Sequence, residues 1–422
     1  MNRMSLRKAW RAAQSGLMAF ALVACGAAES DDAVTPGEDG ENDAFLDPSG
    51  KVDAFGVAEG TPEALGILRV VNESDLPALQ QMGVSTRSAN SIAAKRVGKD
   101  KKLGSWDDRE IVTLSKFDAI PYVGRKTFDA VFKHAKQAGF IEPWSLRRAK
   151  APRLVTLGDL HGDATAARDA LQIAGVLDGG ENWIGGDTVV VQLGDILDRG
   201  DGEKEILDLF EKLAPQAKAA GGEFIWVLGN HEFMNVYWDF SYVTPGGFSA
   251  FADVPGLDLS DPRLAAVAAK EKPRAAAFLQ GGPYARRLAK HNTVAIVGDT
   301  LFVHGGVVPA FTDQLEAVNY DARAWLLWDE LEFPSLLDDD DSVVWTRAYG
   351  EAGATDCAQL EQVLQSVGVK RMVVAHTPQL NGITWDCDEK LYRVDTGMSS
   401  YYGGPVEVLE IIGPDVWTIT AQ

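Results

Sequence analysis

Residues 188–200 read Thr-Val-Val-Val-Gln-Leu-Gly-Asp-Ile-Leu-Asp-Arg-Gly, an apolar run that ends in a loop of glycines, acids and an arginine. Short, uninterrupted apolar runs are typical of strands that are buried on both faces. Similar runs recur along the chain, and stretches with helical spacing separate several of them. The pattern predicts an α/β fold with polar loops at the strand ends. The runs are 153–157, 188–193, 223–228, 300–303 and 370–375, and the helical stretches are 164–174, 203–213 and 357–367.

The loops that follow these runs hold four of the six histidines in the chain. One histidine in a loop is usually a packing residue, but five polar loops in this order predict a common site. The remaining two histidines, His134 and His291, lie in helical or linker surroundings, and we interpret both as structural. The loops read Gly158-Asp-Leu-His-Gly162, Gly194-Asp-Ile-Leu-Asp-Arg-Gly200, Gly229-Asn-His-Glu232, His304-Gly-Gly306 and Ala375-His-Thr-Pro378.

These side chains suit a pair of divalent cations. Two neighbouring cations repel each other, so a carboxylate that touches both offsets the most charge, and Asp195 is the candidate for this bridge. Imidazole, carboxylate and one amide oxygen favour Mn, Fe or Zn, with Mn preferred here, over a calcium cage. Such a pair lowers the pKa of a shared water and yields hydroxide for in-line attack. Because arginines accompany the ligands, phosphorus is the expected target.

The same loops resemble those of the calcineurin-like metallophosphoesterases, and more closely those of the Shewanella-like protein phosphatases within the phosphoprotein phosphatase superfamily. The likeness runs from about residue 153 to residue 411 and includes Tyr242-Val-Thr-Pro-Gly246 and Val394-Asp-Thr-Gly-Met-Ser399. It implies a sandwich of two mixed sheets flanked by helices. The segment Ser399-Ser-Tyr-Tyr-Gly-Gly404 departs from the C-terminal signature of the eukaryotic serine/threonine enzymes, which weakens any transfer of their regulatory partners.

The resemblance also implies the role of each site residue. His231 would protonate the leaving oxygen and Asp198 would orient it. Arg199 would bind the phosphoryl oxygens, with Asn230 beside it, and Arg347 in Trp345-Thr-Arg347 fits the place of a second phosphate-binding arginine. One metal would be held by Asp159, His161 and Asp195, and the other by Asp195, Asn230, His304 and His376.

The N-terminal segment has the features of an export signal. Residues 1–11 are basic and residues 16–24 form a short apolar run, too short to span a bilayer. The following Leu22-Val-Ala-Cys-Gly26 resembles a bacterial lipobox, which implies a signal peptide over 1–24, lipidation of Cys25 and a lipid-anchored location in the cell envelope. An ordinary signal peptide is the alternative. In an oxidising compartment Cys357 and Cys387 could form a disulfide, and two free thiols are the alternative.

Two further segments precede the catalytic region 152–422. Residues 29–63 contain eleven acids and one base, so we interpret 25–62 as a disordered tether. Residues 63–143 show helical spacing, and two pieces around Gly83 and Gly124 resemble a tandem helix-hairpin-helix domain. Residues 87–153 carry sixteen basic and seven acidic side chains, yet the glycine motifs are incomplete, so a structural or protein-docking role is favoured over DNA binding.

Composition limits the alternatives. The chain has 422 residues, 46% of them apolar, and a net charge of −21. These values exclude a wholly disordered protein and one whose entire surface grips nucleic acid. The sequence predicts a dinuclear-metal phosphomonoesterase acting on phosphoproteins. A nucleotide or dinucleoside polyphosphate hydrolase is the enzymatic alternative, and an envelope interaction protein using the basic module is the other. The insertion 239–290 is either a cap over the site or a helical buttress.

Overall fold

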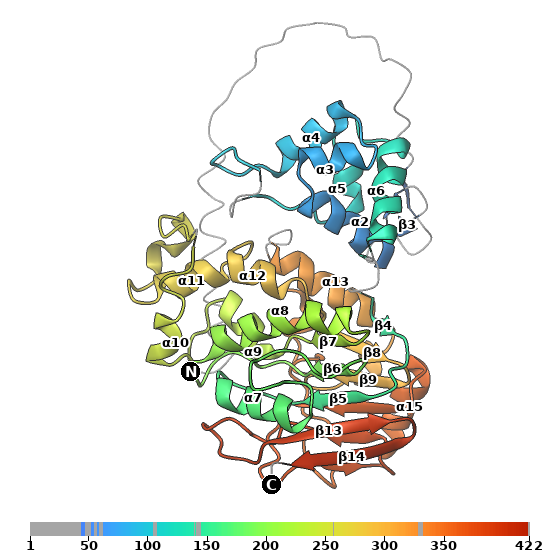
Figure 1. The fold of residues 1–422 in the computed structure, drawn as a ribbon, viewed down its shortest axis with the longest axis vertical. Helices are drawn as coiled ribbons and strands as arrows, with labels where there is room; N and C mark the ends of the chain where they lie inside the picture. The colour runs from blue at the N-terminus through green and yellow to red at the C-terminus, as the bar shows by residue number, and fades with distance from the viewer. Residues whose placement is uncertain are drawn as a thin grey trace, which may run out of the picture.

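The computed structural model describes residues 44–46, 52–54, 57–58, 62–103, 108–138, 140, 145–255, 257–327 and 332–420. Figure 1 shows a helical part near the N-terminus, drawn in blue, above a larger α/β part that holds the later elements. The predicted signal peptide and Cys25 lie outside the described residues. Within the described part, no helix combines the length and apolarity needed to cross a membrane.

The first sheet of the α/β part has the order β14-β13-β5-β6-β7. β5, β6 and β7 run parallel, and β13 pairs antiparallel with β5. The three parallel strands are almost wholly buried, as their apolar sequences predict. The strands are β5 (Leu154–Leu157), β6 (Val189–Gln192), β7 (Glu223–Trp226), β13 (Glu407–Ile412) and β14 (Asp415–Thr420).

The second sheet has the order β11-β12-β10-β9-β8-β4. β8 and β9 form an antiparallel hairpin that turns at Gly298, and β10 lies parallel to both β9 and β12. The sheet is therefore mixed, like the first. Its strands are β4 (Arg147–Arg148), β8 (Val294–Val297), β9 (Thr300–Val303), β10 (Arg371–Val374), β11 (Thr384–Asp386) and β12 (Leu391–Arg393).

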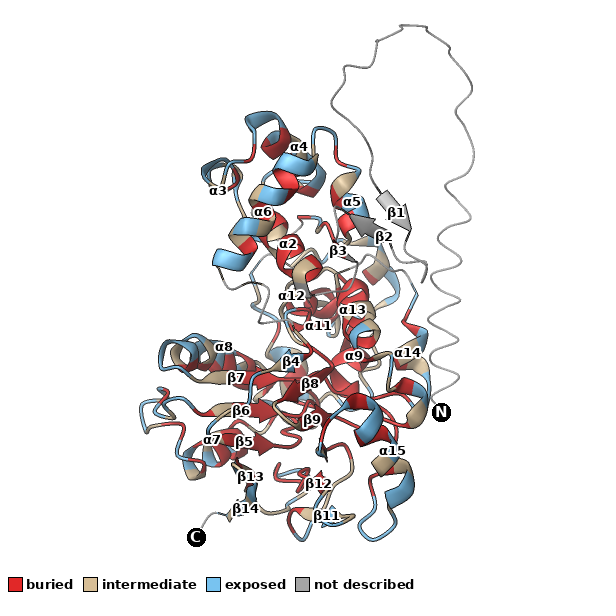
Figure 2. Ribbon diagram, turned by 90° about the vertical axis from the view of Figure 1, so that its right-hand side faces the viewer, coloured by how far each residue is buried: buried red, intermediate tan, exposed pale blue. Residues whose placement is uncertain are grey.

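The two sheets pack face to face. One buried cluster takes Val191 and Ile225 from the first sheet together with Phe302, Val373 and Tyr392 from the second. Helices cover the outer faces, and Figure 2 shows the buried strands inside this layer of helices, whose outer sides are exposed. The predicted sandwich of two mixed sheets flanked by helices is confirmed.

The three predicted helices are present. They are α7 (Ala164–Ile173), α8 (Glu203–Ala219) and α15 (Cys357–Val367). Asp356 caps the start of α15 with its side chain, and Gly368 ends it with a φ of 75°, a conformation that glycine adopts readily. A disulfide joins Cys357 to Cys387, so the bonded alternative is the one present.

The insertion after β7 packs as a buttress in most of its length. α11 (Lys272–Phe278) and α12 (Pro283–Leu288) pack on each other, and the rings of Phe251, Phe278 and Tyr284 meet with centroids 4.8–5.3 Å apart. The start of the insertion is the exception, because Asp239, Ser241 and Tyr242 line the pocket described below. The other helices here are α9 (Asn230–Val236), α10 (Pro245–Ser249), η2 (Pro262–Ala266), η3 (Pro309–Phe311), α13 (Leu315–Leu326) and α14 (Ser335–Asp338).

The N-terminal module contains two pairs of helices at the places where the sequence resembles helix-hairpin-helix pieces. α3 and α4 flank a turn in which Gly83 has a φ of 101°, and α5 and α6 flank a second turn in which Tyr122 has a φ of 69°. Ser88 donates a hydrogen bond to the Tyr122 carbonyl at 2.7 Å and so ties the two pieces together. The helices are α2 (Pro62–Glu73), α3 (Leu76–Gln81), α4 (Thr86–Arg96), α5 (Leu114–Asp118) and α6 (Arg125–Gln137).

Within the described residues of the helical domain expected over 63–143, all regular elements are helices. In the preceding segment, 25–62, which was expected to be a disordered tether, residues 44–46, 52–54 and 57–58 form three short antiparallel strands, and most of the rest lies outside the described residues. The physical reason is that β2 packs on α5 and β3 on α2, where Val57 is buried. The composition of this segment alone does not indicate that α5 and α2 pack against its strands. The strands are β1 (Ala44–Leu46), β2 (Val52–Ala54) and β3 (Val57–Ala58).

Candidate active site

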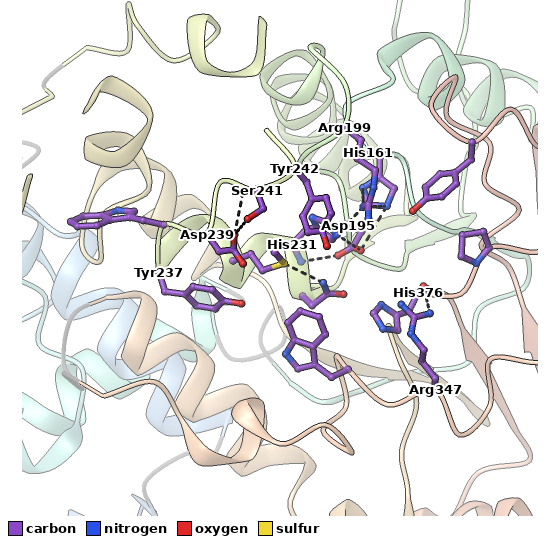
Figure 3. Close-up of a pocket in the computed structure, with 16 residues that line it drawn as sticks. His161, Asp195, Arg199, His231, Tyr237, Asp239, Ser241, Tyr242, Arg347 and His376 are labelled. Atoms are coloured by element: carbon purple, nitrogen blue, oxygen red, sulfur yellow. Dashed lines mark hydrogen bonds and ion pairs between the residues drawn. The ribbon is translucent and has the colours of Figure 1, made fainter. Parts of the chain in front are cut away.

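The strand-end loops converge as the sequence predicts. Asp159 and His161 follow β5, and Asp195, Asp198 and Arg199 follow β6. The second sheet delivers its residues to the same place, because β9 and β10 end beside the first sheet. Seven of the predicted site residues line one pocket (Figure 3): His161, Asp195, Arg199, Asn230, His231, Arg347 and His376. The other three, Asp159, Asp198 and His304, lie directly behind them in contact with these residues or with each other.

Several of these residues have an unusual backbone conformation. Five non-glycine residues of the site have φ between 44° and 71°, in the left-handed region that L-residues seldom adopt. Such strain persists only where surrounding structure holds it, and it clusters at functional sites. Four of the five side chains line the pocket, and the fifth, Asp198, contacts His231. The five are His161, Asp195, Asp198, Arg199 and His376.

Asp195 belongs to two groups of potential metal ligands. It lies with His161 and His231 in one group and with His304 and His376 in the other. Its Oδ2 atom is 3.2 Å from His304 Nε2 and 3.9 Å from His161 Nε2. This sharing is the geometry expected of a bridging ligand.

The remaining predicted ligands surround these groups. Asn230 Oδ1 is 3.1 Å from His304 Nε2, and Asp159 lies 3.7 Å from His161 and 3.8 Å from His304. His376 is buried, and within the described part of the chain its Nε2 atom has no hydrogen-bond partner. A buried nitrogen of this kind, among carboxylates and imidazoles, fits a metal ligand. The donor set therefore fits two divalent cations.

Backbone carbonyls orient two of the imidazoles. His304 Nδ1 donates to the Leu193 carbonyl at 2.6 Å, and His161 Nδ1 donates to the Leu197 carbonyl at 3.0 Å. Each bond leaves Nε2 pointing toward Asp195, which is the role of the outer hydrogen bonds around metal-binding histidines. Burial, with His231 nearby, lowers the pKa of His161 to about 3, so its ring is neutral and its Nε2 carries an acceptor lone pair.

Two aspartates of the predicted ligand set, Asp159 and Asp195, differ in their electrostatic surroundings. Burial and the neighbouring acids Asp395 and Asp195 raise the pKa of Asp159 well above its usual value. Burial acts on Asp195 in the same direction, but the three histidines around it lower its pKa well below the usual value. Asp195 is therefore charged, whereas the negative charge around Asp159 calls for a cation to offset it.

His231 and Asp198 form the expected pair. His231 Nδ1 donates to Asp198 Oδ2 at 2.5 Å, and Asn235 Nδ2 donates to the other carboxylate oxygen at 3.1 Å. Burial alone would raise the pKa of Asp198, but the bonds from His231 and Asn235 and the charge of Arg274 lower it overall. The ring is thus fixed with Nε2 toward the pocket.

Two arginines line the same pocket, which has a volume of about 320 Å³. Arg199 Nη1 lies 2.8 Å from His231 Nε2 and 3.0 Å from His161 Nε2. Arg347 donates to the His376 carbonyl at 3.1 Å and to the Thr377 hydroxyl at 2.8 Å. In the view of Figure 3 the two arginines lie on opposite sides of Asp195. Both are placed to reach the oxygens of a phosphate between them.

Sequence reasoning missed several residues that support this site. Glu232 accepts hydrogen bonds from the amides of Gly229, Asp195, Ile196 and Leu197 and so fixes the loop that carries Asp195. Burial, together with Asp195, raises its pKa to about 7. Asp395 lies beside Asp159, and burial raises its pKa to about 6. Glu232 belongs to the motif 229–232 and Asp395 to the motif 394–399, so membership of these motifs was the sequence feature that could have identified both residues.

A family model of the calcineurin-like phosphoesterases matches residues 152–380. The chain belongs to the calcineurin-like phosphoesterases. Its relatives support a narrower grouping: it is 41% identical over 298 residues to Shewanella-like protein phosphatase 2 of Arabidopsis thaliana, covering 63% of this chain and 76% of that protein. It is 27% identical over 266 residues to Shewanella-like protein phosphatase 1 of Plasmodium berghei, covering 60% and 69%. The resemblance drawn from the loops is confirmed.

Solved structures show the same fold for this phosphoesterase. A cold-active protein-tyrosine phosphatase of a psychrophilic Shewanella species superposes with a TM-score of 0.54 at 24% identity, covering 65% of this chain and 82% of that chain. A second structure of a cold-active protein tyrosine phosphatase gives 0.55, covering 65% and 77%. The phosphoesterase is a hydrolase of phosphate esters. The family match begins at residue 152 and so leaves the helical module outside it.

Proposed function

We propose that the phosphoesterase is a metal-dependent phosphomonoesterase that acts on phosphoproteins, with phosphotyrosine as the preferred residue. One observation carries the proposal: Asp195 is shared by two ligand groups in the same pocket that holds the His231–Asp198 pair and two arginines. The residues expected to hold the metals, bind the phosphate and protonate the leaving group thus lie at one place, which supports the proposal.

Different groups of the site have different roles in the proposed reaction. Two divalent cations, with Mn favoured, would supply Lewis acidity and a water of lowered pKa. Arg199 and Arg347 bind the phosphoryl oxygens and neutralise the charge that develops on them. His231 donates a proton from Nε2 to the leaving oxygen, and Asp198 holds the ring for that transfer.

The pocket walls support an aromatic ester. Five aromatic side chains line the pocket: Tyr237, Trp238, Tyr242, Trp345 and Tyr402. Rings on several sides give an aromatic leaving group more contact than a short alkyl one receives. The names of the relatives, which are protein phosphatases, support a protein substrate.

The test compares substrates on the chain from residue 26 onward, supplied with Mn²⁺. We expect turnover of a phosphotyrosyl peptide and of nitrophenyl phosphate, lower turnover of a phosphoseryl peptide, and loss of both activities in His231→Asn. Hydrolysis confined to diadenosine tetraphosphate would instead establish the nucleotide alternative. Absence of activity with Mn²⁺, Fe²⁺ and Zn²⁺ would leave the interaction-protein alternative.

We also propose export and lipid anchoring at Cys25 in the cell envelope. The lipobox-like residues 22–26 and the Cys357–Cys387 disulfide support this location, since disulfides persist in oxidising compartments. Metabolic labelling with a radioactive fatty acid tests it. Label is expected on the wild-type chain and not on Cys25→Ser, and equal labelling of both would contradict it.

A further inference from the structure

Arg274 is a fully buried arginine that comes from the insertion, in α11. Its guanidinium makes a two-point ion pair with Glu203, in which Nη1 meets Oε2 at 2.5 Å and Nη2 meets Oε1 at 2.8 Å. Nη1 also donates to the Gly247 carbonyl at 2.9 Å. The rings of Phe251 and Phe278 lie 4.8 and 5.1 Å from its central carbon. The guanidinium is thereby held in one orientation.

A role in packing alone does not account for these charges. Removing an arginine and a glutamate from water is costly, and an apolar side chain of similar volume would fill a site walled by phenylalanines at least as well. The buried ion pair also makes specific contacts to Asp198 of the catalytic pair. These contacts suggest what the charges do.

Three contacts lead from Arg274 to Asp198. Nη2 of Arg274 lies 3.5 Å from Asp198 Oδ1. Nε donates to Asn235 Oδ1 at 2.8 Å, and the amide of Asn235 in turn donates to Asp198 Oδ1. Glu203 Oε1, which Arg274 holds, accepts a hydrogen bond from the Asp198 backbone amide at 2.5 Å. One guanidinium therefore fixes both the backbone and the carboxylate of Asp198.

We propose that Arg274 is a positioning residue for protonation of the leaving group: through Glu203 and Asn235 it holds Asp198 in the place from which Asp198 orients His231. Arg274 does not touch the pocket itself. The proposal rests on the proposed function, because it assigns the cause of the geometry on which His231 depends.

The neighbouring Arg287 provides a matched control. Like Arg274, it links the insertion to α8, where it pairs with Asp208 and Glu211 at 2.8 Å each. Within the described part of the chain, Arg287 forms no hydrogen bond or ion pair with Asp198, Asn235 or Glu203, and it does not line the pocket. Replacement of Arg287 therefore removes an ion pair between the insertion and α8 and leaves the contacts of Asp198 and His231 unchanged.

The experiment measures kcat and KM of the full chain, with Mn²⁺, for 2,4-dinitrophenyl phosphate, 4-nitrophenyl phosphate and phenyl phosphate. These esters differ in how much the leaving oxygen needs a proton. We expect Arg274→Met to lower kcat for phenyl phosphate by about 100-fold, the lower end of general-acid contributions, and for the dinitrophenyl ester by only a few-fold. KM and bound metal should stay unchanged, and Arg274→Lys should recover part of the loss. Arg287→Met should match the wild type.

Other results would overturn the inference. An equal loss with all three esters, accompanied by metal loss, would make Arg274 a structural residue. Should Arg274→Met fail to fold, Asn235→Ser removes one of the three contacts while the direct contact and the one through Glu203 remain, and it must show a smaller loss with the same dependence on the leaving group. A His231→Asn variant tests the proposed acid role of His231 separately from the positioning role of Arg274. If it slows all esters equally, the proposed acid role fails; if it alone discriminates between them, only the role of Arg274 fails.

Discussion

Gly162 and Gly200 lie so close that a Cβ atom on Gly162 would come within 2.6 Å of the Gly200 carbonyl carbon. Both glycines flank loops that carry site residues, and the Gly162 amide donates to the Ile196 carbonyl at 2.7 Å. The contact brings the β5 and β6 loops to the distance at which His161 and Asp195 share a site.

Replacement of Gly162 by alanine tests this contact against Gly175→Ala. Gly162 and Gly175 have φ values of 67° and 65°, but a Cβ on Gly175 meets nothing within 4 Å. Gly175→Ala should cost about 1–2 kcal/mol of unfolding free energy from backbone strain alone. Gly162→Ala should add about 1–3 kcal/mol of overpacking and also lose metal and activity. Urea unfolding measures the stability of each variant, and elemental analysis measures its bound metal. Similar effects of the two variants would show that the close approach is unimportant.

Asp195 and Arg199 should separate metal binding from phosphate binding. Asp195→Asn removes the charge shared by both ligand groups, so bound metal and turnover should fall together. Arg199→Ala should keep its metal while kcat/KM falls by about 100- to 1,000-fold. Elemental analysis of the purified variants, beside their kinetics, decides between these roles. Equal metal loss in both variants would contradict the assignments.

The disulfide should contribute to stability and not to catalysis. It closes a loop with a sequence separation of 30 residues, for which loss of chain entropy in the unfolded state corresponds to about 3–4 kcal/mol. Neither cysteine lines the pocket. The double variant Cys357→Ala/Cys387→Ala should therefore unfold at lower urea concentration with kcat unchanged. Dithiothreitol should destabilise the wild type but not this variant; a response from both would indicate another cause.

Asp386 should stabilise the fold in a pH-dependent manner. Burial alone would raise the pKa of Asp386, but the hydrogen bonds from Arg393 and Thr355 and the charge of Arg393 lower it overall. Its contribution is thus present above the unfolded-state pKa of about 4 and is lost as the pH falls through the folded-state pKa. Asp386→Asn leaves the buried Arg393 without its ion-pair partner.

We therefore expect Asp386→Asn to lower the unfolding free energy by about 3 kcal/mol at pH 7. The difference from the wild type should shrink between pH 5 and pH 3, as measured by urea unfolding. Asp388→Asn, at an exposed position two residues later, is the control and should change little. A difference at Asp386 that stays constant with pH would mean that its charge is not responsible.

The residues of the site could be predicted from the sequence more fully than the residues that hold them in place. Asp195 and His304 could be predicted because an apolar run before each one marks a buried strand, and buried strands of one fold bring their loops together. Arg274 could not, because its sequence context reads as an ordinary helix and its partner Glu203 is 71 residues away. The strand around Val57 was missed for the same reason: what buries it is α2, a contact that local composition does not encode. Whether the insertion was cap or buttress also depended on tertiary packing.

The first and last predicted ligands, Asp159 and His376, are 217 residues apart in the chain. A growing polypeptide therefore has no complete site until nearly all of the α/β part has been synthesised and both sheets have joined. A fragment that ends before residue 304 would lack both ligands that follow strands of the second sheet, His304 and His376. The connectivity of the fold thus delays hydrolytic competence until assembly is finished.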